Sequence, residues 1–250
     1  MLLLRSRRSA LRLSGLAGIA GALCWTLGDA LIVGGNASPA DYPLLMKDYA
    51  DRIAFGALAE TLSSPETRLA AGALVANVAI PLYLLGSWHF YLGLRPAGRI
   101  IALVVFALLV CGNAWSPLGH AAFYFIAMVY KTVMLVPDSA HGALLDLGAH
   151  FHRLLMIAWL LPVVTLALAT LLLGIAIVRG GSGYPRWAAA ILNPVSLMAF
   201  GIGLPFALPE PLSTWLHGAG INLGWLLAYG LSTVLLWDSP RPATTAAAAE

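Results

Sequence analysis

The stretch LLMIAWLLPVVTLALATLLLGIAIV, residues 154–178, decides the fold class of this chain. It carries no charged side chain, and it exceeds the roughly 20 residues that a helix needs to cross a bilayer of about 30 Å. Charged residues make up only 10% of the sequence and hydrophobic residues 60%. Further apolar stretches lie at 13–28, 69–94, 100–130, 187–209 and 211–237. We therefore expect an all-α, polytopic transmembrane helix bundle.

The stretch 100–130 is too long for one crossing, and Gly112-Asn-Ala-Trp-Ser-Pro117 inside it is rich in helix breakers. A break at this point predicts about seven helices, with a re-entrant hairpin over 98–136 as the alternative. An odd number of crossings would place the termini on opposite sides of the membrane. The expected helices are 12–35, 66–92, 98–114, 118–136, 150–178, 187–207 and 213–237. One membrane domain over 1–240 and a flexible Ala-rich tail at 241–250 complete the chain.

The longest polar connection, 35–63, contains apolar side chains at helical spacing. They are Tyr42, Leu45, Met46, Tyr49 and Ile53. Charged residues occupy the other side of the same segment. This pattern predicts one amphipathic surface helix after the first crossing.

The net charge of +3 is small, and attraction to anionic lipid head groups explains it without a nucleic-acid partner. Cys24 and Cys111 both lie in apolar stretches, so we expect no disulfide and no metal or other cofactor. Four arginines precede the first apolar stretch, at 5, 7, 8 and 12. The positive-inside rule then favours a cytoplasmic amino terminus in a bacterial cytoplasmic (inner) membrane.

Asp29 is the clearest candidate for a functional group, because an ionisable side chain at membrane depth normally faces protein or water. It shares a helix face with Ser14, Gly18 and Ala22, small residues that favour close helix packing. Asp29 is therefore expected to point into the bundle. It is either a structural carboxyl group or a functional one.

A second group of polar residues follows the helical period on the expected fourth helix. His120, Tyr124 and Lys131 fall on one face, as in a helix that lines a cavity. The alternative is that these side chains serve the two membrane boundaries. Asp29, Asn77, Asn113, His120 and Asn193 also lie at similar predicted depth, which suggests one polar pocket. Asp29 and His120 are its candidate catalytic pair, and the candidate ligand-binding residues are Asn77, Asn113, Tyr124, Lys131, Asn193, Asn222 and Tyr229.

The remaining histidines do not have the spacing of a metal site. His150 and His152 are two residues apart and point away from each other on a helix, and the chain has no HxxxH pair. The absence of that pair also argues against membrane hydrolases of the ceramidase and progestin-receptor type. Positions near the membrane boundaries are the expected explanation for His89, His141, His150, His152 and His217.

Four short motifs resemble landmarks of a bacterial family of seven-helix integral membrane proteins of unknown function. The motifs are Leu27-Gly28-Asp29, Trp115-Ser116-Pro117 with His120, Tyr184-Pro185-Arg186-Trp187 and the stretch 218–224. The resemblance implies a membrane bundle over most of the chain and no particular activity.

Three functions therefore stay open at the level of sequence. The first is an enzyme that uses Asp29 and His120 for acid/base chemistry on a lipid or another lipophilic small molecule. The second is a small-solute or proton-coupled transporter with the same pocket. The third is a non-enzymatic sensor or assembly factor. Membrane lipids are the expected partners in each case.

Overall fold

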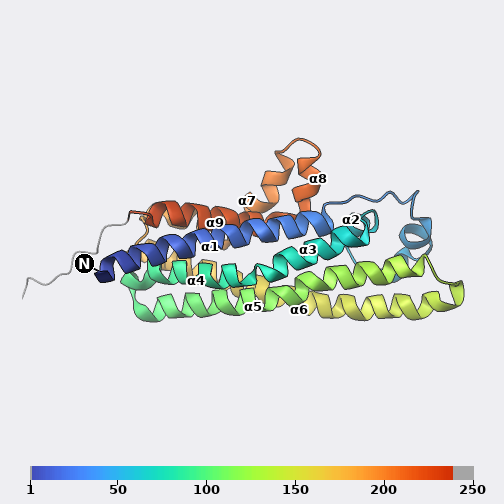
Figure 1. Ribbon diagram of the computed structural model, residues 1–250, viewed down its shortest axis with the longest axis horizontal. Coiled ribbons are helices and arrows are strands. Elements are labelled where there is room, and N and C mark those ends of the chain that lie inside the picture. The colour runs from blue at the N-terminus through green and yellow to red at the C-terminus, as the bar shows by residue number, and fades with distance from the viewer. Residues whose placement is uncertain (1, 239–250) are drawn as a thin grey trace, which may run out of the picture.

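The computed structural model describes residues 2–238 and builds them from helices, with no strand in that range (Figure 1). The expected tail at 241–250 lies outside the described residues. The long helices are α1 (Leu2–Val33), α3 (Glu66–Val78), α4 (Ile80–Leu94), α5 (Arg99–Val133), α6 (Asp138–Arg179), α7 (Pro194–Phe206) and α9 (Gly220–Leu236). Shorter helical turns are η1 (Leu44–Asp48), η2 (Ala50–Arg52), α2 (Leu58–Leu62), η3 (Arg95–Ala97), η4 (Arg186–Ala190), α8 (Leu212–Leu216) and η5 (His217–Ala219).

Within the described residues, 5 helical stretches are long and apolar enough to cross a membrane, and α7 is a shorter apolar helix. One of these stretches joins α3, α4 and η3 over Glu66–Ala97. Pro81 separates α3 from α4, because it lacks the amide hydrogen that would bond to the carbonyl of Asn77. The expected helical membrane bundle is thus confirmed.

The predicted break at Gly112–Pro117 is wrong, because α5 continues through it to Val133. The glycines in this region serve as contact points with α6. A Cβ at Gly112 would lie 2.7 Å from atoms of Thr165 and Leu166, and one at Gly119 would lie 3.2 Å from the carbonyl of Ala158. Close packing against α6 thus holds α5 together, although Pro117 removes one backbone hydrogen bond.

The two helices expected over 98–136 are therefore one helix, α5. Arg12 Nη2 lies 2.8 Å from Asp238 Oδ1, so the first part of α1 and the end of α9 lie at the same end of the bundle (Figure 1). With the shorter helix α7 added to the 5 long stretches, the described residues contain one apolar segment fewer than the seven expected.

The α5–α6 hairpin extends beyond the rest of the bundle (Figure 1). At 1.5 Å per residue the 42 residues of α6 measure about 63 Å, roughly twice the thickness of a bilayer core. The outer part of the hairpin packs against the connection between α1 and α3. Leu45, Phe55 and Leu62 of this connection are buried in one cluster with Tyr130 and Leu145 of the hairpin.

The single amphipathic helix predicted for this connection is not formed. The segment contains three short helical pieces, η1, η2 and α2, separated by turns. Its apolar side chains do face one way, but they pack against the α5–α6 hairpin. The helical spacing of these apolar residues therefore identified a buried face, but the α5–α6 hairpin covers it in place of the membrane surface.

Helices α7 and α8 form an arm that projects sideways from the bundle (Figure 1). Asn193 caps α7, because its Oδ1 accepts hydrogen bonds from the amides of Val195 and Ser196 at 3.0 and 3.1 Å. Val195 and Phe206 on the arm are 76% and 69% exposed. An apolar surface of this kind is suited to lipid contact.

Candidate functional site

The site is built around Asp29, about one turn before the end of α1. Gly28, the preceding residue, lets α1 and α3 cross closely: a Cβ there would lie 2.9 Å from the carbonyl oxygen of Gly72. This crossing directs Asp29 toward α5 and α9. Asp29 Oδ1 lies 3.2 Å from Nε2 of His120 on α5, and the two side chains are only 17% and 7% exposed.

The second oxygen of Asp29 is held by α9. Asn222 Nδ2 donates to Asp29 Oδ2 at 2.7 Å, and the Tyr83 hydroxyl donates to Asn222 Oδ1 at 2.8 Å. The hydroxyl of Tyr83 thus orients the amide of Asn222, and that amide in turn orients the carboxyl group. Four helices, α1, α4, α5 and α9, contribute to this arrangement.

His120 is buried but is not saturated by hydrogen bonds. Neither ring nitrogen has a hydrogen-bond partner, so the 3.2 Å contact with Asp29 lacks the alignment of a hydrogen bond. The ring instead rests edge-on against Trp25, with the ring centroids 4.9 Å apart. A buried imidazole with free nitrogens is unusual, because most buried polar atoms are paired.

Asp29 and His120 line a cavity of about 470 Å³, a volume in the usual range for small-molecule sites. Asn113 and Asn222 add polar groups to the same wall. The opposite wall is apolar and comes largely from α6 and α7. It includes Trp159, Val163, Leu166, Met198 and Ile202.

The apolar wall of the cavity reaches the surface of the bundle. Trp159 of α6 and Ile202 of α7 line the cavity and are 39% and 52% exposed. Gly56, Ala57 and Glu60, from the connection between α1 and α3, also line it. The cavity therefore combines a polar end with an apolar wall that is partly exposed.

The comparison with protein families adds one result. Residues 8–239 match the model of a family of unknown function, DUF6796. The chain belongs to this family. No match was found among curated proteins or among solved structures. The matched residues include the helices of the bundle and the cavity, and no activity is known for the family.

Of the nine candidate residues, the structure gathers Asp29, His120, Asn113 and Asn222 around the cavity. Asn113 Nδ2 also donates to the Ser87 hydroxyl at 3.4 Å. The other candidates are Asn77, Tyr124, Lys131, Asn193 and Tyr229, and none of them lines the cavity.

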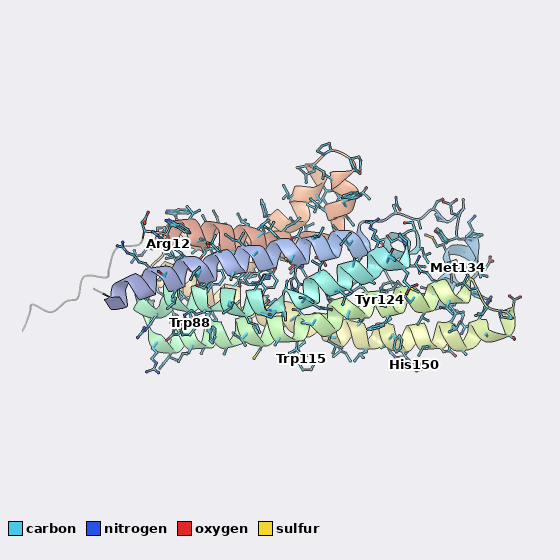
Figure 2. The ribbon with its side chains drawn as sticks, viewed as in Figure 1. Arg12, Trp88, Trp115, Tyr124, Met134 and His150 are labelled. Carbon is cyan, nitrogen blue, oxygen red and sulfur yellow. The ribbon has the colours of Figure 1, made fainter. Side chains whose placement is uncertain are left out.

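Tyr124 and Lys131 share a face with His120, as expected, but lie nearer the hairpin tip. Tyr124 donates to Glu66 Oε1 at 3.2 Å, on the outside of the bundle (Figure 2). Lys131 Nζ donates to the carbonyls of Leu62 and Ser64 at 2.6 and 2.8 Å. Tyr124 therefore links the start of α3 to the hairpin, and Lys131 links the connection between α1 and α3 to it.

The remaining three candidates lie outside the cavity, in helix packing, at a helix cap and at a kink. Tyr229 is fully buried and stacks on Tyr83, with ring centroids 5.8 Å apart. Asn193 caps α7. Asn77, at the kink between α3 and α4, has a buried Oδ1 without a hydrogen-bond partner.

The histidines occupy different surroundings, and across residues 2–238 no three His, Cys, Asp or Glu side chains form a metal-binding group. His150 is exposed on the outer side of α6 (Figure 2). His217 lines the cavity. His89 is 1% exposed, and its ring nitrogens lie 2.9 Å from Leu11 O and 2.8 Å from Ser232 Oγ, so it is buried between α1, α4 and α9.

Trp25, Tyr83 and Glu60 are among the lining residues that the sequence analysis missed. Tyr83 lies in the middle of its crossing, far from the boundary positions that tyrosine prefers, and this was a usable signal. Glu60 was a lone acidic residue in the apolar context Leu58–Leu62. Trp25 likewise lies inside an apolar stretch, where tryptophan is less expected than at the membrane boundaries.

Proposed function

We propose that this membrane protein binds a lipophilic small molecule in the cavity and acts on it by acid/base chemistry with Asp29 and His120. The observation that carries the proposal is the carboxyl–imidazole pair, 3.2 Å apart, at the polar end of an otherwise apolar cavity. A buried pair of this type is a common arrangement for proton transfer.

The neighbouring side chains suggest different roles for Asp29 and His120. Asn222 and Tyr83 hold the carboxyl group in place through a chain of two hydrogen bonds. Neither ring nitrogen of His120 makes a hydrogen bond, and only Nε2 contacts Asp29, so His120 is the group that exchanges a proton with a bound molecule. Asp29 at 3.2 Å stabilises the imidazolium that forms when His120 accepts a proton.

The apolar opening supports entry of the molecule from the bilayer. A chain-like molecule lying between α6 and α7 would meet Trp159 and Ile202 at the surface and reach Asp29 with its polar end. Membrane lipids, or lipophilic molecules dissolved among them, fit this geometry.

The packing beside the cavity favours an enzyme over a carrier that passes a solute through the bundle. The packing consists of buried aromatic rings in mutual contact, those of Trp25, Tyr83, Phe90, Trp225 and Tyr229. This aromatic cluster closes the bundle on the side of the two termini. A molecule that enters between α6 and α7 would therefore leave by the same route.

Charge supports a cytoplasmic location for both termini, in a bacterial inner membrane. The end of the bundle with the termini carries Arg5, Arg7, Arg8, Arg12, Arg95, Arg99, Arg179 and Arg186. The opposite end carries fewer basic residues, Lys47, Arg52, Arg68, Lys131 and Arg153. By the positive-inside rule the end with the termini faces the cytoplasm and the extended hairpin faces outward.

The proposal is tested by comparing the lipid extracts of cells that express the wild type or a variant. In wild-type cells we expect one lipophilic compound to fall and a related one to rise, measured by liquid chromatography and mass spectrometry. His120→Asn should abolish the conversion while the protein level in the membrane is unchanged. Identical extracts from the two strains would contradict the proposed chemistry.

A second pair of variants tests binding in the cavity. Ile202→Trp fills the opening from a position that is 52% exposed, so folding should tolerate it. Ile175→Trp is the control, because Ile175 is 38% exposed on α6 and does not line the cavity. Wild-type protein should co-purify with a lipophilic compound, detected by mass spectrometry. Loss of this compound from Ile202→Trp alone would support the site, and its absence from the wild type, or its loss from both variants or from neither, would contradict the site.

A further inference from the structure

The charged side chains that line the cavity indicate which polar end a lipophilic ligand would carry. Its lining includes two carboxyl groups, those of Asp29 and Glu60, and among the described residues neither lysine nor arginine lines it. An anionic group would meet these two carboxyl groups. The bases that line the cavity are His120, which already lies 3.2 Å from Asp29, and His217. A cation would find two oppositely charged partners in a region of low dielectric constant.

Glu60 has an unpaired carboxyl oxygen that a cation could contact. Its Oε2 atom is buried and has no hydrogen-bond partner. The nearby cations are occupied elsewhere: Arg68 Nη2 donates to the carbonyls of Ala30 and Gly34 at 2.9 and 3.1 Å, and Lys131 donates to Leu62 and Ser64. A carboxylate in this position is costly unless a bound group supplies the missing charge.

A separate observation on His120 supports a ligand at the polar end of the cavity. His120 is 8% exposed, lines the cavity, and has no hydrogen-bond partner on either ring nitrogen. Aromatic rings surround the same space, from Trp25, Tyr83 and Trp225. The faces of such rings attract ammonium groups, above all quaternary ones.

We infer that the cavity binds an amphiphile with an ammonium head group, in preference to one with a phosphate or a neutral polyol head. The inference rests on the proposed function, because it names the class of molecule that the same cavity takes. The ammonium group lies between Asp29 and Glu60 against the aromatic rings, and the hydrocarbon chain leaves between α6 and α7.

The test compares three probes with the same dodecyl chain: trimethylammonium, phosphate and triethylene glycol head groups. The full-length protein is titrated with each probe in dodecyl maltoside micelles, and native mass spectrometry counts the bound molecules. A hydrogen bond or contact with a charged partner contributes enough for a difference of about tenfold or more in Kd. We expect the ammonium probe to bind at least that much more tightly than the other two.

Glu60→Gln should weaken binding of the ammonium probe by about tenfold and remove most of its advantage over the neutral probe. Glu66→Gln is the matched control, because Glu66 is exposed, bonds to Tyr124 and does not line the cavity. It should leave all three affinities unchanged.

The possible results separate this inference from the proposed function. Equal or tighter binding of the phosphate or glycol probe, blocked by Ile202→Trp, would overturn the ammonium preference and leave the lipophilic site intact. Binding of no probe, or binding that Ile202→Trp does not weaken, would overturn the site itself. An ammonium preference that persists in Glu60→Gln and in Asp29→Asn would also overturn the inference, because other groups would then have to recognise the charge.

Discussion

At the scale of the residue, Asp29 combines a structural bond with a chemical role. Asn222 donates to one carboxyl oxygen, and His120 lies beside the other. Asp29→Asn keeps an oxygen for Asn222 but loses the charge beside His120. We expect it to fold with nearly wild-type stability and to lose activity on the lipophilic substrate.

Asp29→Ala should behave differently, because it leaves Asn222 without its acceptor. An orphaned buried donor costs about 1–3 kcal/mol of the free energy of unfolding. The two variants are compared in a detergent melting assay and in the lipid conversion assay. Full activity of Asp29→Asn would show that the carboxyl group has only a structural role.

A second buried histidine gives a separate prediction far from the cavity. Ser232 Oγ lies 2.8 Å from both His89 Nε2 and the hydroxyl of Tyr184, and Ser232 is fully buried. Burial raises the pKa of Tyr184, so its phenol stays a neutral hydrogen-bond donor. Ser232→Ala should lower the free energy of unfolding by about 1–3 kcal/mol, because it orphans both partners.

The measurement for Ser232→Ala is a detergent melting curve together with the affinity for the ammonium probe. Stability should fall while the affinity stays at the wild-type value, since the network lies among α1, α4, α9 and the loop that contains Tyr184. Ser213→Ala on the partly exposed α8 serves as the control. A loss of affinity in Ser232→Ala would mean that the network and the cavity are coupled.

At the scale of the element, the close crossing of α1 and α3 at Gly28 positions the neighbouring residue, Asp29. A Cβ at Gly28 would be 2.8 Å from Ala76 Cβ and 2.9 Å from the Gly72 carbonyl oxygen. Gly28→Ala should therefore separate α1 from α3 and destabilise the protein by about 1–3 kcal/mol. It should also weaken probe binding, because Asp29 is the next residue along α1.

Gly230→Ala on α9 is the matched control, since a Cβ there would meet nothing within 4 Å. Alanine favours a helix over glycine by up to about 1 kcal/mol, so this variant should be neutral or more stable. Melting temperatures of both variants in the same detergent make the comparison. Equal melting temperatures for Gly28→Ala and Gly230→Ala would contradict the role given to the crossing.

The elements also show which features the sequence could predict. The crossings themselves were visible as long apolar stretches, because hydrophobic length is a local property. The continuity of α5 was not visible: Gly112 and Pro117 locally favour a break, and only the packing of α6 against this region explains why the helix persists.

The part of the candidate site that could be predicted is the part fixed by a residue's depth in the membrane and by the helix face it occupies. Asp29 and His120 meet because both are polar and lie at the same depth on facing helices. Tyr124 and Lys131 share the face of His120, but Tyr124 meets the start of α3 and Lys131 meets the connection before it. Their partners depend on the tertiary path of that connection, which no periodic pattern encodes.

At the scale of the whole molecule, the path of the chain predicts that both termini lie on one side of the membrane. The ion pair between Arg12 and Asp238, 2.8 Å long, ties the start of α1 to the end of α9. The α5–α6 turn lies at the opposite end of the bundle (Figure 1). Reporters fused to the amino terminus and to the carboxyl terminus should therefore be active in the same compartment.

A third reporter, inserted after the exposed Ser139 in the first turn of α6, should be active in the opposite compartment. Green fluorescent protein, which fluoresces in the cytoplasm, and alkaline phosphatase, which needs the periplasm, give complementary signals at each position. The basic residues around the termini predict cytoplasmic signals from both ends. A carboxyl-terminal reporter in the periplasm with the amino terminus in the cytoplasm would require an odd number of crossings. Such a result would mean that α5 does not run as one helix, and it would remove the support for His120 lying beside Asp29.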